Sequence, residues 1–510
     1  MIVTGKIRKG AYFDSITLMR CGKEIAAMKG IVDAAVVMGT RSNKAILSSS
    51  GLAVPLFDDA GEADLLIVLK AGSREAAAAA LASADAHLKG AGKMSGSAGE
   101  RHPVSLEGAL EIFPDANLAL ISVAGRYAGK EAIKALERGL HVMLFSDNVP
   151  VEEEIELKRL ARKNGLLAMG PDCGTAIING IPLGFANVVN RGDIGIVAAA
   201  GTGLQEVSCI LSNAGAGISQ AIGTGGRDVK KAVGGIMFLE ALKALGNDES
   251  TRVILLIAKP PDRDVMNRIT RETRRIRKPV VTLFIGAKPR GEQPSTLEQA
   301  ALMAVALSRG DDPGEVAGRL AARNEEVRQM AIREAGKRKQ RQKYLRGLFS
   351  GGTFCAEAQI LFSRMIPNVF SNAPTGAARQ LENSLSSREN TVVDLGEDEF
   401  TVGRPHPMID YSLRKQRFRQ EAHDPETAVI LLDVVLGYGS NPDPASELSE
   451  VIRESAKKVA VVCSVTGTDQ DPQVRSSVKD RLEEAGAIVM PTNAAACIFA
   501  GTIAQVRGGK

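Results

Sequence analysis

The sequence predicts a multidomain α/β protein, and three observations support this prediction. The chain of 510 residues is too long for a single hydrophobic core. Short apolar runs alternate with helical stretches of about 10 to 15 residues, a pattern typical of βαβ units and parallel sheets. Aromatic residues make up only 4% of the chain and tryptophan is absent, so the cores must be packed mainly from aliphatic side chains.

The bulk composition argues against several classes of protein. The formal net charge of +5 is small for this length, so we expect no nucleic-acid partner, although its sign suits a small anionic substrate. The six cysteines include no C-x-x-C pair, which argues against a metal site and a disulfide framework and favours a reducing compartment. Neither a signal peptide nor an apolar run of about 18 residues occurs, so we expect a cytoplasmic protein without a membrane span.

Residues 1–88 are expected to form a small N-terminal α/β domain. The predicted strands are residues 12–19, 31–38 and 64–70, and the predicted helices are residues 21–30, 42–51 and 73–88. Residues 89–103 are rich in glycine and serine and lack periodicity, so they are predicted to form a flexible linker.

The rest of the chain is expected to contain three further α/β domains, at residues 104–190, 191–312 and 346–510. Residues 313–345 carry many charges of both signs and few apolar side chains. They are therefore predicted to be a charged, solvated helical linker, because a nucleic-acid arm would carry one sign of charge with interleaved aromatic residues.

An internal repeat connects the last two of these domains. Residues 198–211 (AAAGTGLQEVSCIL) and 349–362 (FSGGTFCAEAQILF) share the pattern G-T-x-x-x-E at a predicted strand-to-helix turn. A similar apolar segment follows each of them, RVILLIAKPP in the first and TAVILLDVVLG in the second. The chain is therefore expected to hold two copies of one α/β domain, with a longer insert in the second.

The glycine-threonine turn itself predicts an anion site. The first N–H groups of a helix and the positive end of its dipole attract an anion, and glycine lets a phosphate approach the backbone. The candidate residues are Gly201, Thr202 and Gly203 in the first copy, Gly352 and Thr353 in the second, and Glu206 and Glu357 one turn further on. The alternative is structural, with each threonine capping its helix and each glutamate favouring the N-terminal end.

These motifs resemble the α subunit of succinyl-CoA synthetase. The matching segments are LALISVAGRYAGKEAIKALERGLHV, MGPDCGT, GIVAAAGTGLQEV, AIGTGGRD and KPVVTLFIGAKP, in the order of that family. The second copy resembles the ligase domain that ends the family's β subunit. The resemblance implies a Rossmann-like CoA-binding-type domain at residues 104–190 and two flavodoxin-like succinyl-CoA-ligase-type domains at residues 191–312 and 346–510.

The chain differs from that family in the parts that carry out the family's reaction. In the family, the two glycine-rich helix N-termini take turns holding a phosphohistidine, but here no histidine occurs between His141 and His406. A nucleotide-grasp domain cannot fit in residues 313–345, and no G-x-x-x-x-G-K-[ST] loop occurs. The glycine-rich turn that opens the CoA-binding domain is also missing. A phosphohistidine relay is excluded, no cofactor is established, and the sequence argues against CoA and ATP.

The chain as a whole resembles the FdrA family. The segments that match are LFSDNV, GPDCGTAI, GTGGRDV, TFCAEA, EFTVGRPHPMID and LDVVLGYGSNPDPA. That family is described as acyl-CoA-synthetase-like and is linked to anaerobic allantoin breakdown, as a subunit of oxamate carbamoyltransferase with two other subunits. The reaction exchanges oxalurate and phosphate with oxamate and carbamoyl phosphate. The resemblance therefore implies a hetero-oligomer and small anionic substrates, without ATP, CoA or phosphohistidine.

Further residues are candidates to bind or activate such a substrate. In GTGGRD, Gly225 and Gly226 precede Arg227, which can bind a carboxylate or phosphate with two hydrogen bonds. In the proline-punctuated segment VGRPHPMID, Arg404 could clamp an anion and His406 could protonate the leaving amide nitrogen. A histidine that only bonds the backbone of a buried loop is the alternative for His406.

Two other motifs contribute candidates of a different kind. Asp433 follows an apolar strand, and open α/β sheets bind ligands beyond the carboxyl ends of their strands. In GPDCGT, Asp172 is a candidate substrate-binding residue whose alternative role is to order the turn, and Cys173 suits a small buried cysteine better than a nucleophile.

The sequence thus leaves three functions open. The first is a carbamoyltransferase subunit, the second is a CoA ligase of altered mechanism, and the third is a non-catalytic regulatory or binding protein with residues 1–100 as its sensor.

Overall fold

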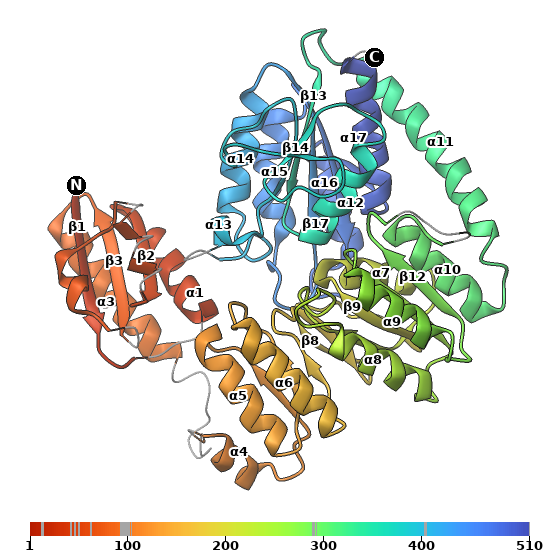
Figure 1. Cartoon of the computed structure of the whole chain (residues 1–510). Coiled ribbons are helices and arrows are strands. Elements are labelled where there is room, and N and C mark those ends of the chain that lie inside the picture. The colour runs from red at the N-terminus through yellow and green to blue at the C-terminus, as the bar shows by residue number, and fades with distance from the viewer. Residues whose placement is uncertain are drawn as a thin grey trace. The chain divides into compact units, whose positions relative to one another are not determined.

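The computed structural model of the chain (Figure 1) describes residues 1–11, 15–40, 43–44, 47–48, 51–61, 64–91, 103, 105–287, 291, 293–401 and 405–508. The chain forms two compact units. Residues 1–115 and 398–406 make up the first unit, and residues 116–397 and 407–510 make up the second. Among the described residues, no helix has the length and apolar character needed to cross a membrane.

The first unit contains a small antiparallel sheet with the strand order β1-β3-β2. Its elements are β1 (Ile2–Arg8), α1 (Ser15–Ala26), β2 (Ile31–Met38), η1 (Pro55–Asp59), β3 (Leu65–Ala71), α3 (Arg74–Ala91), α4 (Leu106–Ile112) and α13 (Asp398–Thr401). Alternate side chains of β3 face opposite sides of the sheet, as strand geometry requires. Leu65, Ile67 and Leu69 pack with α1 and α3, whereas Leu66 and Val68 pack with residues around η1.

The prediction of a strand at residues 12–19 is wrong, because α1 already begins at Ser15. Leu18, Cys21 and Ile25 recur at helical spacing and are all buried in the same cluster. This helical periodicity outweighs the strand propensity of the β-branched residues in the segment. The first strand is instead β1, which the sequence analysis missed, and the predicted strands at 31–38 and 64–70 correspond to β2 and β3.

The second unit begins with a three-stranded parallel sheet in the order β4-β5-β6. Its elements are β4 (Leu118–Ile121), α5 (Gly125–Glu137), β5 (His141–Leu144), α6 (Val151–Lys163) and β6 (Ala168–Met169). The strands and helices alternate, as the sequence analysis predicted for this part of the chain.

The first copy of the repeat forms a six-stranded sheet in the order β12-β11-β9-β10-β7-β8. The strands are β7 (Thr175–Ile178), β8 (Ile181–Gly184), β9 (Arg191–Ala199), β10 (Ile218–Gly223), β11 (Val253–Ala258) and β12 (Val280–Phe284). The helices are α7 (Gly201–Asn213), α8 (Ile236–Asn247), α9 (Arg263–Thr273) and α10 (Leu297–Arg309). The pairs among β9 to β12 are parallel, and the hairpin of β7 and β8 joins them in antiparallel orientation.

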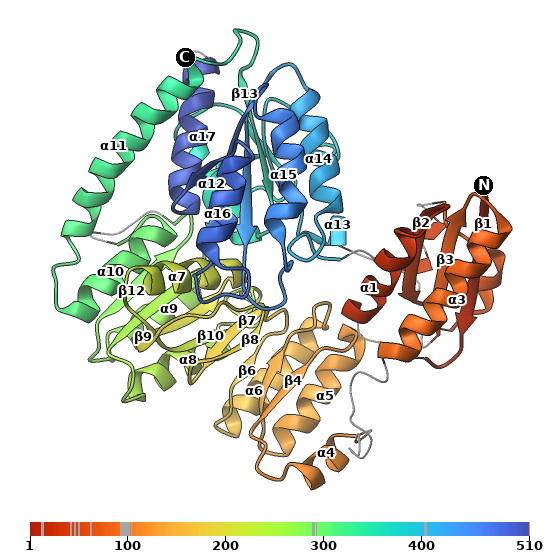
Figure 2. The same ribbon diagram turned by 180° about the vertical axis from the view of Figure 1, so that it is seen from behind.

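The second copy forms a seven-stranded parallel sheet in the order β15-β14-β16-β13-β17-β18-β19. The strands are β13 (Tyr344–Phe349), β14 (Val369–Ser371), β15 (Arg379–Gln380), β16 (Asn390–Asp394), β17 (Thr427–Val435), β18 (Ala460–Thr466) and β19 (Ile488–Met490). The helices are α12 (Gly352–Phe362), α14 (Ser412–His423), α15 (Pro444–Ser455), α16 (Arg475–Glu484) and α17 (Asn493–Gly508). Seen from behind, α14, α15 and α16 cover one face of this sheet (Figure 2).

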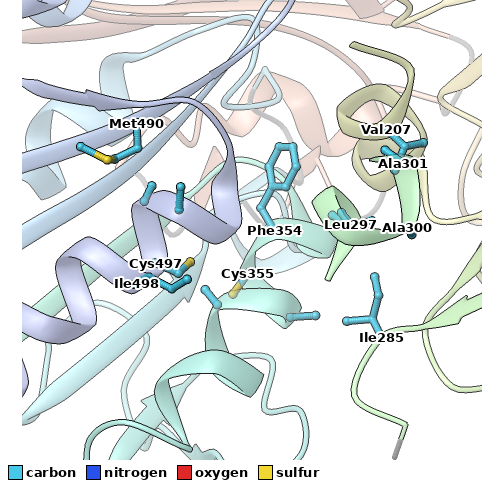
Figure 3. Packing of buried hydrophobic residues seen from close by; sticks show 14 of the residues in the cluster. Val207, Ile285, Leu297, Ala300, Ala301, Phe354, Cys355, Met490, Cys497 and Ile498 are labelled. Carbon is cyan, nitrogen blue, oxygen red and sulfur yellow. The ribbon is translucent and has the colours of Figure 1, made fainter. Parts of the chain in front are cut away.

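The two copies share one arrangement and pack together through equivalent helices. In each copy the strand before the glycine-threonine turn, β9 or β13, lies between β10 or β16 on one side and β11 or β17 on the other. The helices α7 and α10 of the first copy contact α12 and α17 of the second. Their apolar side chains form one continuous core, which Figure 3 shows around Phe354 and Leu297. The repeat inferred from the sequence is therefore a repeat in space.

The charged segment between the copies contains α11 (Glu315–Ala335). It was expected to be solvated throughout, yet four of its side chains are buried, those of Val316, Val327, Ala331 and Ala335. They recur on one face, and α11 packs against α17 along that face. A narrow apolar stripe among many charges is enough to dock a surface helix.

Candidate functional site

The two glycine-threonine turns meet at their tips within the second unit. The backbone N–H of Thr353 donates a hydrogen bond to Thr202 Oγ1 over 3.4 Å. A Cβ added to Gly203 would lie 2.8 Å from Thr353 Cγ2, and a Cβ added to Gly351 would lie 2.7 Å from Thr202 Cγ2. Glycine at these two positions therefore permits the close approach of the N-termini of α7 and α12.

Neither helix N-terminus has a side-chain cap. The N-cap residues are Ala200 and Gly351, and neither has a side chain that accepts a hydrogen bond from the first turn of its own helix. The structural alternative, in which each threonine caps its own helix, is therefore wrong. Two uncapped positive helix ends that face one another favour a bound anion. Gly201 is exposed, and nothing lies within 4 Å of a Cβ placed on it.

A lysine from the first copy reaches the helix end of the second. Lys259 directly follows β11, and its Nζ lies 3.8 Å from the point that a Cβ on Gly352 would occupy. Among the described residues, its ammonium group forms no ion pair with a carboxylate within 4 Å. Lys259 was not among the residues predicted from the sequence. The rule that singled out Asp433, a polar residue after an apolar strand, would have found it.

Glu206 and Glu357 link the two copies rather than facing open space. Glu357 accepts hydrogen bonds from the backbone N–H of Leu297 at 2.7 Å and from Asn493 Nδ2 at 2.8 Å. Glu206 accepts from the backbone N–H of Asn493 at 3.0 Å and from Thr466 Oγ1 at 2.5 Å. Leu297 begins α10 and Asn493 begins α17, so each glutamate caps a helix of the other copy.

Burial raises the pKa of both glutamates. The pKa of Glu357 rises from 4.5 to about 7, chiefly because its carboxylate is desolvated, while its two hydrogen bonds oppose that rise. The pKa of Glu206 is raised for the same main reason. Both are predicted as catalytic residues by the sequence, and that role stays a prediction beside the observed role in joining the copies.

Asp433 lies at the end of β17 and orders the turn before α12. Its two oxygens accept hydrogen bonds from the backbone N–H of Ser350 at 2.8 Å and from Ser350 Oγ at 2.7 Å. Arg414 is buried beside it, with Nη2 3.0 Å from Asp433 Oδ1. The carboxylate therefore holds the residue that precedes Gly351. Direct contact between Asp433 and a substrate stays a prediction.

A second carboxylate, that of Asp394, lies at the end of β16. Asn372 holds its backbone, accepting from the N–H of Asp394 at 2.9 Å and donating to its carbonyl at 2.9 Å. Asp394 Oδ1 accepts from the N–H of Gly396, whereas Oδ2 lies 2.7 Å from the point that a Cβ on Gly352 would occupy. Asp394 was not among the residues predicted from the sequence, although it ends an apolar strand.

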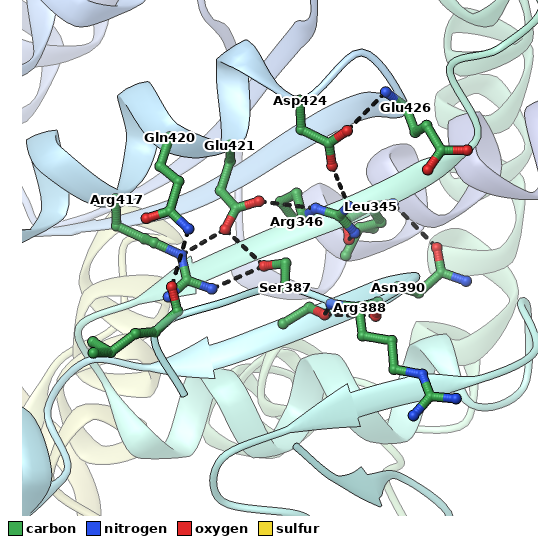
Figure 4. Close-up of polar contacts among 12 residues, drawn as sticks. Leu345, Arg346, Ser387, Arg388, Asn390, Arg417, Gln420, Glu421, Asp424 and Glu426 are labelled. Atoms are coloured by element: carbon green, nitrogen blue, oxygen red, sulfur yellow. Dashed lines mark hydrogen bonds and ion pairs between the residues drawn. The ribbon is translucent and has the colours of Figure 1, made fainter. Parts of the chain in front are cut away.

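The opposite end of the same sheet carries a network of ion pairs (Figure 4). Arg346, on β13, contacts Glu421 at 2.9 Å and Asp424 at 2.6 Å. Arg417 contacts the other oxygen of Glu421 at 2.5 Å. Buried charges at this amino end are neutralised by partners of opposite sign, whereas Lys259 and Asp394 at the carboxyl end form no such pair.

The motifs GTGGRD and GPDCGT touch each other. A Cβ on Gly225 would lie 2.2 Å from the carbonyl oxygen of Pro171, and Gly226 is exposed with nothing near its Cβ position. Asp172 is exposed and its backbone N–H donates to the Ser146 carbonyl. Their predicted roles in substrate binding are not tested by these contacts.

Charged residues of GTGGRD bind α6 to the first copy. Lys158 is fully buried and donates to Glu154 at 2.8 Å and to Asp228 at 2.9 Å. Arg227 contacts Glu154 at 2.9 Å and donates to the Val149 carbonyl. The guanidinium of Arg227 is thus held by the protein itself, and its binding of a substrate anion stays a prediction.

Cys173 has the surroundings of a structural cysteine. It is buried, its thiol donates to the carbonyls of Thr175 and Gly223, and burial raises its pKa to about 12. A thiol with so high a pKa is a poor nucleophile at neutral pH.

The proline-punctuated segment is only partly described. Arg404 lies outside the described residues, and His406 belongs to the first unit, whereas the glycine turns belong to the second. The roles predicted for Arg404 and His406 therefore stay predictions.

Comparisons with known proteins agree with the two-part architecture. Residues 1–103 match the family "AllF, heavy metal-associated domain", and residues 348–503 match the family "CoA-ligase". The chain is 41% identical over 497 residues to the protein YahF of Escherichia coli, a match that covers 95% of each chain. It is 30% identical over 181 residues to a succinate–CoA ligase subunit alpha-2 of Trichomonas vaginalis, covering 34% of this chain and 57% of that subunit.

Among solved structures, the chain is similar to PH0766 from Pyrococcus horikoshii, with 15% identity and a TM-score of 0.31. That alignment covers 81% of this chain and 89% of the other.

The N-terminal domain does not fit a heavy-metal site, despite the family that it matches. Soft metal ions bind thiolates, and residues 1–103 contain a single cysteine, Cys21. Cys21 is buried, and burial raises its pKa to about 11, so it stays a protonated thiol. Within the described part of the chain, no group of three or more His, Cys, Asp or Glu side chains could hold a metal ion.

In the domain before the first copy, the start of α5 is not a glycine turn that could bind the phosphates of CoA. Helix α5 begins at Gly125, and a Cβ there would lie 2.1 Å from the carbonyl oxygen of Asp147. Backbone therefore fills the space at this helix end, and the glycine serves the packing of the β5–α6 loop.

Proposed function

The chain belongs to the FdrA family, and from this premise we propose that it is a subunit of oxamate carbamoyltransferase. Its scaffold is of the CoA-ligase type, and its N-terminal domain is of the AllF type. The proposed reaction exchanges carbamoyl phosphate and oxamate with phosphate and oxalurate, in the cytoplasm and together with two other subunits. Carbamoyl phosphate, oxamate, phosphate and oxalurate are all anions near neutral pH. This agrees with a site built around helix N-termini.

One observation carries the proposal: two uncapped helix N-termini meet beside Lys259, with no histidine between residues 141 and 406 to share them. The first-turn N–H groups of α7 and α12 would bind the phosphate oxygens, and Thr202 Oγ1 would donate to the same group. Lys259 would neutralise its charge. The scaffold would then hold a phosphate-bearing substrate where its relatives hold a phosphohistidine.

The site residues would act by positioning and charge stabilisation. The amide nitrogen of oxamate attacks the carbamoyl carbon, the C–O bond to phosphate breaks, and the leaving phosphate gains charge. Helix N-termini and an ammonium group stabilise that charge more in the transition state than in the ground state. Arg227 is the proposed ligand for the oxamate carboxylate, because GTGGRD lies at the same edge of the sheet as the turn of α7.

The test is the reaction itself. The chain is combined with the two other subunits, carbamoyl phosphate and oxamate are added, and phosphate release and oxalurate formation are both measured. The double variant Thr202→Ala with Thr353→Ala should lower the rate at least tenfold, because both threonines lie at the meeting point of the turns. No product from the wild-type complex under any combination of subunits would refute the proposal.

A second candidate function is favoured by the match of residues 348–503 to the CoA-ligase family. It is an acid–CoA ligase of altered mechanism. It predicts acyl-CoA formation from ATP, CoA and a carboxylic acid, measured by loss of free thiol. A third outcome, activity that is unchanged by Thr202→Ala and His406→Ala in the complex, would favour a non-catalytic binding or regulatory subunit.

A further inference from the structure

Asp394 is a buried carboxyl group that no part of the proposed phosphate binding uses. It is 3% exposed, at the carboxyl end of β16, next to β13 from which α12 emerges. One oxygen is fixed by the N–H of Gly396 at 2.9 Å, and Asn372 holds the backbone on both sides. The other oxygen is directed at the start of α12, where only the absence of a side chain on Gly352 makes room for it.

Lys259 approaches the same point from the other copy. The Cβ position of Gly352 lies 2.7 Å from Asp394 Oδ2 and 3.8 Å from Lys259 Nζ. The carboxyl group of Asp394 and the ammonium group of Lys259 nevertheless form no ion pair with each other within 4 Å. A cation, a carboxyl group and two uncapped helix N-termini thus converge on one small region, to which both copies contribute.

We infer that Asp394 is the general base and acid of the carbamoyl transfer, taking the proton from the attacking amide nitrogen and returning it to the leaving phosphate. This inference rests on the proposed function. It assigns to Asp394 the proton transfer for which the sequence suggested His406. In this scheme Lys259 binds the phosphate group, and Asp394 accepts the proton and returns it.

The step balances without any further reactant. The nitrogen of oxamate forms a bond to the carbamoyl carbon, and the C–O bond to phosphate breaks. The proton on that nitrogen passes to Asp394 and then to a phosphate oxygen, which leaves as hydrogen phosphate. In the reverse direction, protonated Asp394 supplies the proton to the leaving amide nitrogen of oxalurate.

The environment of Asp394 suits this exchange. Burial, as the largest cause, raises its pKa from 3.8 to about 7. The charged groups that face it are Glu397 and Asp433, which raise the pKa further, and Lys259, which lowers it. A group with its pKa near the working pH is populated in both protonation states, which is the optimum for proton transfer.

The inference is tested in the full complex with carbamoyl phosphate and oxamate. Asp394→Asn should lower kcat by about 10²- to 10⁴-fold, with little change in KM for carbamoyl phosphate, because phosphate binding is left to the helix ends and Lys259. The wild-type kcat should rise with pH through about 7 as Asp394 loses its proton, and this limb should vanish in Asp394→Asn. His406→Ala should keep the limb.

Two further variants test the inference even if Asp394→Asn does not fold. Asp394→Glu should recover at least a tenth of the wild-type kcat. Glu397→Gln should keep kcat within threefold and move the limb to lower pH, because it removes a like charge that raises the pKa of Asp394. A limb that does not move in Glu397→Gln, together with no recovery of kcat in Asp394→Glu, would overturn the inference.

The outcomes separate the inference from the proposed function. An inactive wild-type complex overturns both. An active complex in which Asp394→Asn has the wild-type kcat and pH profile overturns the role of Asp394 alone and leaves carbamoyl transfer standing.

Discussion

The two copies of the repeat have the same backbone arrangement but different side chains at their carboxyl ends. Both place a glycine-threonine turn and an uncapped helix after the central strand. The first copy adds a cation, Lys259, directly after β11, whereas the second adds two carboxyl groups, those of Asp394, the last residue of β16, and Asp433, near the end of β17. A duplicated backbone thus supplies equivalent helix N-termini, while the charges on the neighbouring strands differ between the copies.

The largest expected effect comes from removing the cation that only the first copy supplies. Lys259→Met should lower kcat/KM for carbamoyl phosphate by about 10²- to 10³-fold, because one charged donor at the phosphate is lost. Steady-state phosphate release from the complex measures it. Lys243→Met, on the exposed surface of α8 in the same copy, is the matched control and should change the rate less than twofold. Equal rates for both variants would place the phosphate elsewhere.

The next effect tests the reciprocal capping between the copies. Glu357→Ala leaves the N–H of Leu297 and the amide of Asn493 without an acceptor in a buried interface, which should lower the free energy of unfolding by about 2 to 4 kcal/mol. Glu206→Ala should have a similar effect. Because both glutamates bind Asn493, the double variant should lose less than the sum of the two. Chemical denaturation measures these values, and exactly additive losses would contradict the shared cap.

A third prediction concerns the pH dependence of stability. The folded pKa of Glu357 is about 7, above its unfolded value of 4.5, so the folded state binds the proton more tightly. Its stabilising contribution is complete below about pH 4.5 and is lost as the pH rises through about 7, by up to about 3 kcal/mol. Glu357→Gln should remove this decline. Unfolding midpoints of the two proteins from pH 5 to 8 measure it, and parallel curves would show that Glu357 does not titrate in this window.

The smallest effect compares two glycines of one turn. Gly203→Ala places a methyl group 2.8 Å from Thr353 Cγ2, which should cost about 1 to 2 kcal/mol of unfolding free energy as the two helix ends are forced apart. Gly201→Ala meets nothing within 4 Å and should cost less than about 0.5 kcal/mol. Thermal unfolding of both variants checks the difference. Equal destabilisation would mean that the tips are not in contact.

Several features of the site could be predicted because they depend on local sequence. Strand-to-helix turns of the form G-T-x-x-x-E are recognisable in one chain, and their repetition predicts two equivalent domains. Residues 15–19 were predicted as part of a strand. The helical spacing of the buried residues Leu18, Cys21 and Ile25 instead indicates α1. Lys259 and Asp394 are single polar residues after apolar strands, and many such residues have no role in a site.

By itself, the sequence determined the α/β architecture, the duplication, the glycine turns and the absence of a histidine between residues 141 and 406. Each of these features depends on composition or on patterns between residues that are close in the chain. Only the tertiary structure decided that the two turns meet, that Glu206 and Glu357 cap helices of the opposite copy, and that Lys259 and Asp394 converge on Gly352. The physical reason is that these contacts join residues of different copies, far apart in the chain, through the packing of α7 and α10 on α12 and α17. No local periodicity encodes that packing.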